Sequence, residues 1–300
     1  MTERPEQNQR DRRVLAFDLG GTKIAAALVA GRTVQDRRQI KTPTSAPTDD
    51  LVAAMSAMAS DWRGAFDAVG IAATGVIRAG EWHPINRSML SIPAGFPLVE
   101  RLEAVFGCRA RAVNDAQAAA WAEYDTRSDD ESLLFVTIST GIGGGLVEHG
   151  RLVEGSNGLA GSVGHIIVRP DNGRRCGCGA IGCIETEAGG MALKERAEEV
   201  LGAALDPPAL FERARSDRAA ALIIDDALNL MSQALLTARR LVDPYRIVIG
   251  GGIGLRSDVL KRLQATSSRL APDFPVRIEA AQLGADAGLV GCALLAAGDD

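Results

Sequence analysis

The stretch VLAFDLGGTKIAAALVA, residues 14–30, contains the pattern on which the fold is built. The apolar run Val14 to Leu19 leads into a glycine turn, and a second apolar run, Ile24 to Ala30, follows at once, which predicts a β-hairpin. The same arrangement returns about 120 residues later over Leu133 to Glu148, with a glycine-rich turn predicted at Thr140 to Gly145. Two such hairpins in one chain predict two related halves.

The rest of the chain alternates helical and strand patterns, which is typical of an α/β architecture. Helices are predicted at 48–62, 98–106, 115–124, 191–201, 208–215, 218–242, 256–270 and 285–296, and further strands at 68–73, 111–114, 246–249 and 276–279. A boundary near residue 117 divides the chain before the second hairpin. The predicted domains are therefore 1–117, joined by the last helix at 285–300, and 118–284.

Composition excludes several classes of protein. A length of 300 residues predicts about two domains. The net charge of −5 argues against a nucleic-acid binder that works by neutralising phosphates. The polar start MTERPEQNQRDRR lacks the apolar region of a signal peptide, and no window reads as a membrane span, so we expect no membrane partner and a cytoplasmic location.

Three of the five cysteines lie close together. Cys176, Cys178 and Cys183 follow His165 within one short segment, and such a set of three sulfur ligands and one nitrogen ligand suits tetrahedral zinc. Four protein ligands close the coordination sphere, so the predicted ion is structural. Chance clustering and disulfides are the alternatives, but disulfide frameworks are typical of small scaffolds in oxidising compartments.

Glycine turns after predicted strands are candidate phosphate loops, because backbone N–H groups can approach phosphate oxygens where no Cβ intervenes. The first is DLGGTK at 18–23, where the carboxylate of Asp18 is placed to hold Mg²⁺ through water. The second is STGIGGG at 139–145, and a third turn at Gly250 to Gly252 suits the nucleoside end of a ligand. Each is also explained by an ordinary glycine turn.

Asp115 lies at a predicted strand-to-helix junction within VNDA, residues 113–116. An aspartate there is either a helix cap or a base that takes a proton from a substrate hydroxyl during phosphoryl transfer. Asn114 beside it is a candidate hydrogen-bond partner for a second hydroxyl.

Taken together, DLGGTK, VND, STGIGGG, GLAGSVGH at 158–165 and CGCGAIGCIE at 176–185 resemble the ROK family of sugar kinases and repressors. The resemblance covers nearly the whole chain, and the cysteine segment is its most specific motif. It implies an actin-like ATPase (ribonuclease H-like) fold, with two α/β domains and a cleft between them. It also implies ATP, Mg²⁺ and structural Zn²⁺ as cofactors, a small sugar as substrate and a homodimer.

The resemblance also implies roles for individual residues. Asp115 matches the catalytic base, and Asn86, Asn114, His165 and Glu185 match sugar-contacting positions, with Thr74 and Gly75 near the sugar. Nucleotide-binding positions are Asp18, Gly20, Gly21, Thr22, Lys23, Thr140, Gly141, Gly143, Gly144 and Gly251. The metal ligands match His165, Cys176, Cys178 and Cys183.

The sugar is the least determined part of the expected function. The stretches NDAQAAAWAEY and ATGVIRAG resemble those of family members that act on N-acetylmannosamine. This resemblance implies phosphorylation of the C6 hydroxyl of N-acetylmannosamine, with N-acetylglucosamine or glucose as alternatives. Ser162 stands where most of these kinases have a sugar-contacting Glu, and a neutral serine cannot make the same charge-assisted bond. A sugar-responsive repressor and a non-catalytic sugar-binding protein are the non-enzymatic alternatives.

Overall fold

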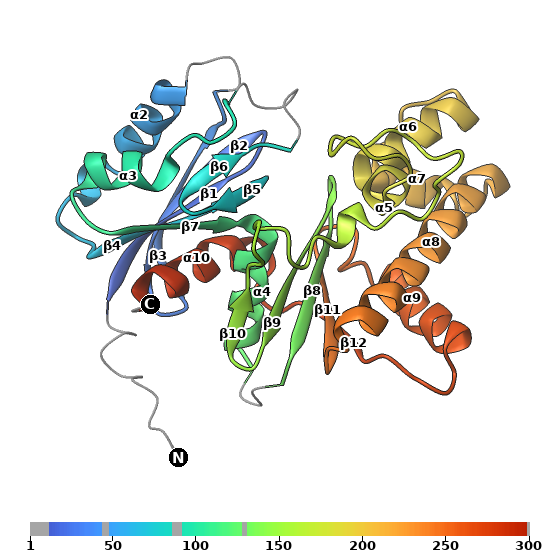
Figure 1. The fold of residues 1–300 in the computed structure, drawn as a ribbon. Helices are drawn as coiled ribbons and strands as arrows, with labels where there is room; N and C mark the ends of the chain where they lie inside the picture. The colour runs from blue at the N-terminus through green and yellow to red at the C-terminus, as the bar shows by residue number, and fades with distance from the viewer. Residues whose placement is uncertain (1–11, 44–47, 86–91, 128–130, 299–300) are drawn as a thin grey trace. The chain divides into compact units, whose positions relative to one another are not determined.

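The computed structural model of the chain describes residues 12–43, 48–85, 92–127 and 131–298 (Figure 1). Contacts between residues divide the chain into two compact units. Unit 1 comprises 1–128, 154–160 and 285–300, and unit 2 comprises 129–153 and 161–284. This division differs from the sequence-based boundary at residue 117, because helix α4 (Asp115–Asp125) packs along its length on elements of unit 1.

Unit 1 is built on a five-stranded sheet in the order β3-β2-β1-β4-β7. Its strands are β1 (Arg13–Leu19), β2 (Lys23–Ala30), β3 (Thr33–Lys41), β4 (Ala68–Ala73) and β7 (Ala110–Asn114). The first three strands are antiparallel, and β4 and β7 run parallel to β1. The predicted first hairpin is confirmed. The sequence did not indicate β3, a mostly exposed edge strand rich in charged and polar residues.

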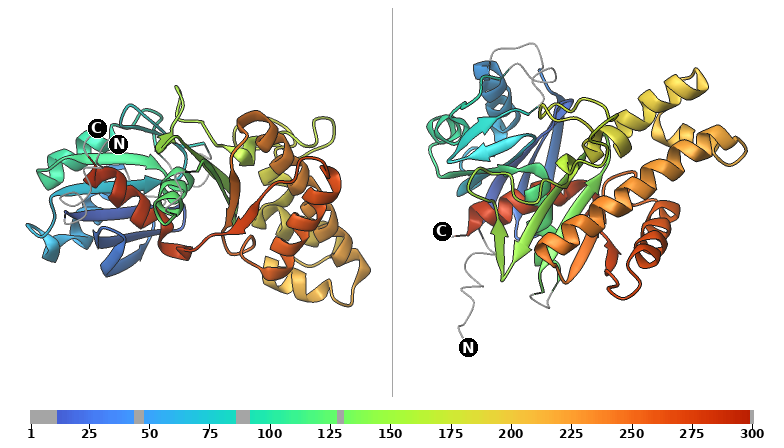
Figure 2. Two further views of the ribbon diagram at one scale, coloured as in Figure 1. Left: turned by 90° about the horizontal axis from the view of Figure 1, so that it is seen from below. Right: turned by 45° about the vertical axis from the view of Figure 1, so that its right-hand side comes forward.

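Helices cover both faces of this sheet (Figure 1). Val69 and Ile71 of β4 point into a core with α2 (Thr48–Met58) and α3 (Leu98–Phe106), whereas Gly70 between them faces α10 (Ala287–Ala297). This follows from the alternation of side chains along a strand. Figure 2 shows α10 along the sheet beside α4. The remaining elements are η1 (Ser60–Trp62), the two-stranded sheet of β5 (Val76–Arg78) and β6 (Glu81–His83), and η3 (Gly284–Asp286).

Unit 2 repeats the strand pattern in the order β10-β9-β8-β11-β12. Its strands are β8 (Leu133–Ile138), β9 (Ile142–Glu148), β10 (Arg151–Val153), β11 (Arg246–Gly250) and β12 (Ile278–Ala280). Again three antiparallel strands are followed by two that run parallel to the first. The predicted turn at Thr140 to Gly145 is too long: Gly143 pairs with Thr137, so the glycines after Gly141 belong to strand β9.

The helices of unit 2 pack around α8 (Arg218–Val242), which lies beside α9 (Ser257–Leu270) in Figure 2. The others are η2 (Val163–His165), α5 (Ile184–Ala188), α6 (Gly190–Leu201) and α7 (Pro207–Arg213). By length and composition alone, α8 is a candidate membrane span, with a mean hydropathy of 1.3 in its most apolar window, which the sequence analysis did not expect. However, 61% of that window is buried inside the protein, as in the core helix of a globular domain.

Glycines allow α10 to lie unusually close to its neighbours. A Cβ at Gly70 would lie 2.4 Å from the carbonyl oxygen of Cys292, and one at Gly291 would lie 1.8 Å from that of Ala118. Both positions are therefore closed to any larger residue unless the backbone moves.

We predict that Gly70→Ala lowers the free energy of unfolding by about 2–3 kcal/mol, because the added methyl forces α10 away from β4. Urea unfolding measures the change. Gly298→Ala is the matched control: Gly298 has a φ of −66°, and the atom nearest to a Cβ there would be the carbonyl oxygen of Leu295, at 3.7 Å. Equal stability of the two variants would contradict this account of the packing.

Candidate active site and metal centre

The three parallel strands of unit 1 end in register. Leu19 of β1 is aligned with Ala73 of β4, and Ala73 with Asn114 of β7. Ligands of open α/β sheets bind at the carboxyl ends of such strands. The candidate residues of unit 1 that the structure describes lie at or directly after these ends: Asp18, Gly20, Gly21, Thr22, Lys23, Thr74, Gly75, Asn114 and Asp115. Asn86 lies outside the described residues.

Asn114 and Asp115 form the junction between β7 and α4. The side-chain oxygen of Asn114 accepts the backbone N–H groups of Ala116 and Gln117 at 3.0 and 3.1 Å, so Asn114 is the N-cap of the helix. Its amide nitrogen donates to the carbonyl oxygen of Gly75 at 2.8 Å. Asp115, half-buried in the first turn, accepts the N–H of Ala116 at 2.8 Å. The capping role that the sequence left open for Asp115 therefore belongs mainly to Asn114.

Thr74 and Gly75 are held by the β5–β6 hairpin. The indole N–H of the buried Trp82 donates to the carbonyl oxygen of Thr74 at 2.7 Å. Gly75 has a φ of +98°, and a Cβ there would lie 2.9 Å from the carbonyl oxygen of His83. Trp82 is thus a positioning residue that the sequence analysis missed, because its apolar ring gives no sign of the hydrogen bond it makes.

Asp18 lies in an environment that penalises its charge. It is half-buried near the end of β1, and a Cβ at Gly288 would lie 3.2 Å from its carboxylate. Burial raises the pKa of Asp18 to about 6, the nearby Asp115 carboxylate adds to the rise, and Lys23 and Arg37 oppose it. A carboxylate with a raised pKa gains from a cation bound nearby, because the cation favours the ionised form.

In unit 2 the second hairpin is tied to Glu185. The carboxylate of Glu185 accepts the backbone N–H of Ile142 at 3.1 Å, and a Cβ at Gly141 would lie 2.4 Å from the same oxygen. The turn itself is closed by a bond from Ser139 N–H to Gly141 O at 2.9 Å. The structure therefore places Glu185 beside the turn at Thr140 and Gly141, although Glu185 comes 45 positions after Thr140 in the sequence.

The glycines of β9 make room for the segment that carries His165. A Cβ at Gly144 would lie 2.3 Å from the carbonyl oxygen of Gly161, and one at Gly164 would lie 1.9 Å from that of Ile142. The backbone of η2 thus lies directly on β9. Gly143, Gly144 and Gly145 of STGIGGG are therefore explained by pairing with β8 and by backbone packing. The assignment of Gly143 and Gly144 to phosphate binding stays a prediction.

Gly251 lies at the carboxyl end of β11, in the third glycine turn. It has a φ of +82°, and a Cβ there would lie 2.4 Å from the carbonyl oxygen of Ile138 at the end of β8. The N–H groups of Ile253 and Gly254 both donate to that same oxygen, at 3.0 and 3.1 Å. The turn is therefore held against the end of β8, which leads into the second hairpin.

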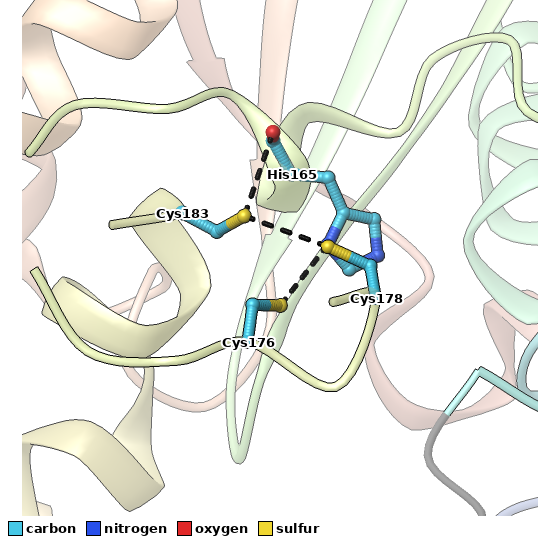
Figure 3. Close-up of side chains that lie close together, drawn as sticks. All are labelled: His165, Cys176, Cys178 and Cys183. Atoms are coloured by element: carbon cyan, nitrogen blue, oxygen red, sulfur yellow. Dashed lines mark hydrogen bonds between the residues drawn. The ribbon is translucent and has the colours of Figure 1, made fainter. Parts of the chain in front are cut away.

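Four side chains of unit 2 converge on one point: His165, Cys176, Cys178 and Cys183 (Figure 3). Their ligand atoms all lie within 4.8 Å of one another. The sulfurs of Cys178 and Cys183 are 3.7 Å apart, and the sulfur of Cys176 is 3.5 Å from Nδ1 of His165. Bonds of about 2.3 Å from sulfur and about 2.0 Å from nitrogen give such spacings around a tetrahedral ion. The set therefore fits a closed metal site.

Glycines shape the loop between the cysteines. Gly179 and Gly182 have φ values of +95° and +75°, so the backbone turns tightly there, whereas Gly177 is not among the glycines with positive φ. Cys176 N–H donates to Ala180 O at 2.8 Å and closes the turn.

Gln117 is a second residue that the sequence analysis missed. It is 3% exposed on α4, and its amide donates to the carbonyl oxygens of Ala160 at 3.1 Å and Glu154 at 3.4 Å. It thereby holds the segment 154–160, which belongs to unit 1, against the helix that begins at Asp115. In the sequence, only its position two residues after Asp115 indicated that Gln117 lies near the candidate site.

Comparisons with known proteins identify the family of the chain. A sequence model of the ROK family matches residues 14–299. The chain belongs to the ROK family. Among its relatives, a protein named N-acetylmannosamine kinase from Salmonella typhimurium is 40% identical over 288 residues, which are 95% of this chain and 98% of the relative.

Two solved structures of ROK family proteins are similar to this chain in fold. The ROK hexokinase of Thermus thermophilus is 32% identical with a TM-score of 0.83, covering 95% of this chain and 97% of its own. The ROK family glucokinase of Streptomyces griseus, in complex with glucose and AMPPNP, is 30% identical with a TM-score of 0.77, covering 95% and 99%. The expected actin-like ATPase fold is confirmed.

We predict that Asp18→Asn stabilises the protein at neutral pH. A raised pKa means that the folded state favours the protonated acid, so the stabilising contribution is present below pH 4 and is lost as the pH rises through about 6. Removing the charge should add up to about 3 kcal/mol at pH 7.5 and about 1 kcal/mol at pH 4.5. Denaturant unfolding at both pH values measures the gain.

The exposed Asp273 supplies the control, since Asp273→Asn should leave stability nearly unchanged at either pH. A gain in Asp18→Asn that is absent at pH 7.5, or is the same at both pH values, would show that Asp18 is not a buried charge.

Proposed function

We propose that this protein is an ATP-dependent kinase that phosphorylates the C6 hydroxyl of N-acetylmannosamine. The observation that carries the proposal is the 40% identity, over nearly the full chain, to relatives named N-acetylmannosamine kinase. The placement of Asp115 at the carboxyl edge of three parallel strands supports it, because phosphoryl transfer to an alcohol needs a positioned base.

In the proposed reaction Asp115 accepts the proton of the C6 hydroxyl while that oxygen attacks the γ-phosphorus of ATP. The bond from the γ-phosphorus to the bridging oxygen breaks, and ADP leaves. The backbone amides of the first hairpin (Gly20, Gly21, Thr22, Lys23) and of the second (Thr140, Gly141, Gly143, Gly144) would donate to phosphate oxygens, and Gly251 would lie near the nucleoside. Asp18 would hold Mg²⁺ through water. Mg²⁺, when bound, neutralises charge on the phosphates.

We assign sugar contacts to Thr74, Gly75, Asn114, His165 and Glu185. Because Nδ1 of His165 faces the sulfur of Cys176, the ring nitrogen for a sugar hydroxyl is Nε2. Oε2 of Glu185 is bonded to Ile142 N–H, and we assign Oε1 to the sugar. Asn114 already bonds Gly75 and the start of α4, so its main effect on the sugar is to fix Asp115 beside it.

N-acetylglucosamine and glucose are the competing substrates. The glucokinase of Streptomyces griseus is 30% identical, against 40% for the relatives named N-acetylmannosamine kinase, which favours N-acetylmannosamine. Ser162 in place of the usual Glu also argues against a plain glucokinase. A coupled assay of kcat/KM across free hexoses and N-acetylhexosamines tests the assignment, and a higher value for glucose would overturn it.

We further propose that the Cys3His cluster holds one structural Zn²⁺. The donor set is that of closed zinc sites, and its spacings fit tetrahedral geometry. A bound ion there holds His165 in place and so orders the sugar-contacting residues of unit 2. The domain assignments at 1–117 with 285–300 and at 118–284 and the cytoplasmic location stay predictions from the sequence, and the homodimer stays a prediction of the family resemblance.

We predict that Asp115→Asn lowers kcat by about 10³-fold with the fold retained, because asparagine keeps the oxygen that accepts Ala116 N–H and loses the base. Steady-state kinetics and a thermal melt measure both effects. Asp125→Asn, at the other end of the same helix and paired with Arg32 at 3.3 Å, is the matched control and should keep its activity. Near-normal turnover by Asp115→Asn would remove Asp115 from its assigned role.

Metal removal gives a separate prediction. The purified protein should contain about one zinc per chain, and Cys178→Ser should lose most of it and raise the KM for the sugar, because metal binding and local folding are coupled. Cys108→Ser, a change at a half-buried cysteine outside the cluster, should retain the zinc. Elemental analysis and kinetics are the measurements. An unchanged sugar KM in zinc-free protein would contradict the structural role of the ion.

A further inference from the structure

The segment that carries the metal ligands is bordered by a buried carboxylate that the proposed reaction does not use. Glu187, near the end of α5, is 1% exposed. One of its oxygens accepts the backbone N–H of Arg174 at 2.8 Å, and the other lies 3.7 Å from the guanidinium of Arg169 and 3.8 Å from that of Arg174. A buried carboxylate is tolerated only when it is paired and hydrogen-bonded, so these partners are necessary to it.

A second acidic residue extends this group into the helices of unit 2. Asp226 of α8 accepts hydrogen bonds from Arg169 and from Arg196 of α6, the latter at 2.6 Å. Arg196 also donates to the carbonyl oxygen of Glu187 at 2.9 Å. We call Glu187, Arg169, Arg174, Arg196 and Asp226 the Glu187 cluster. It connects the loop before the cysteines to α5, α6 and α8.

The backbone carries this connection to the metal ligands. The N–H groups of Val168 and Arg169 donate to Gly182 O at 2.8 and 3.2 Å, and Gly182 N–H donates to Arg174 O at 2.8 Å. A Cβ at Gly182 would lie 1.9 Å from Arg169 O, so the two backbones are in direct contact. Gly182 immediately precedes the ligand Cys183. A shift of Arg169 or Arg174 is therefore transmitted to the cysteines.

The same shift would reach the sugar contacts. Cys183 is the N-cap of α5, and Glu185 lies in its first turn, two residues before Glu187. A helix of five residues does not hold its own conformation, so the placement of α5 depends on tertiary contacts. Those contacts include the Glu187 cluster at one end and the bond from Ile142 N–H to Glu185 at the other.

We propose that Glu187 is a positioning residue that keeps the zinc ligands and Glu185 in their binding arrangement. Its carboxylate balances Arg169 and Arg174 and so holds the ligand loop on α5. The sugar part of this inference rests on the proposed kinase activity, whereas the metal part rests only on the proposed zinc site.

The test is the isosteric variant Glu187→Gln, which keeps an acceptor for Arg174 N–H and removes only the charge. Zinc release from the purified holoprotein to 4-(2-pyridylazo)resorcinol should be about 10-fold faster than from the wild type, because the segment that holds the ligands loses its charge pairing. Glu199→Gln is the matched control: Glu199 is the exposed partner of the same Arg174, and its loss should leave release unchanged.

A double-mutant cycle distinguishes the loss of the Glu187–Arg169 pair from a general destabilisation of unit 2. The effects of E187Q and R169Q on zinc release should be clearly non-additive in the double variant, because each variant removes the Glu187–Arg169 pair, with R169Q also removing the bond to Asp226. In kinetics, E187Q should raise the KM for the sugar by about 10-fold and leave the KM for ATP within about 2-fold of the wild-type value. A merely structural defect would not single out the sugar KM.

Wild-type zinc release by E187Q would overturn the proposal, even if its melting temperature fell. Equal rises in the KM values for sugar and ATP would overturn the sugar part. If the wild-type protein phosphorylates no sugar, the proposed function fails, and the comparison of zinc release between E187Q and E199Q still decides the role of Glu187.

Discussion

The register of the parallel strands in unit 1 is the constraint on which its candidate site depends. Because Leu19, Ala73 and Asn114 are aligned across β1, β4 and β7, three segments far apart in sequence end at one edge of the sheet. A slip of one residue would turn every side chain of a strand to the opposite face. Gly70 would then no longer meet α10, and the junction that carries Asp115 would no longer lie beside Gly75.

In unit 2 the candidate residues are placed mainly by close contacts between backbone segments. Its glycines let η2 lie on β9, let the turn after β11 meet the end of β8, and let Gly182 lie on Arg169. The close approach leaves little freedom to the segments that carry His165 and Cys183. A metal ion bound there would join ligands that the backbone already brings near one another, and less ordering entropy would be lost on binding.

Much of the fold followed from local patterns. Apolar runs predicted β4, and helical spacing predicted α3 and α8, with the bounds that the structure has. Several elements were missed because they had no such pattern. Among them, β3 is mostly exposed and polar, α5 has five residues, and β5, β6 and β10 have three residues each. The glycines of β9 were assigned to a turn because glycine favours turns in any local sequence. Their place in a strand is decided by pairing with β8, which the local sequence does not show.

The sequence by itself determined the chemistry of this protein: a Cys3His donor set, a carboxylate after a strand, and glycine turns of the ROK type. Only the tertiary structure decided that Asn114 caps α4 and bonds Gly75, that Trp82 holds Thr74, and that Glu187 is surrounded by arginines. The physical reason is how far along the chain the interacting residues lie from one another. Ligand type and turn preference belong to single residues and their neighbours, whereas the partner of a buried polar group is chosen by packing between distant segments.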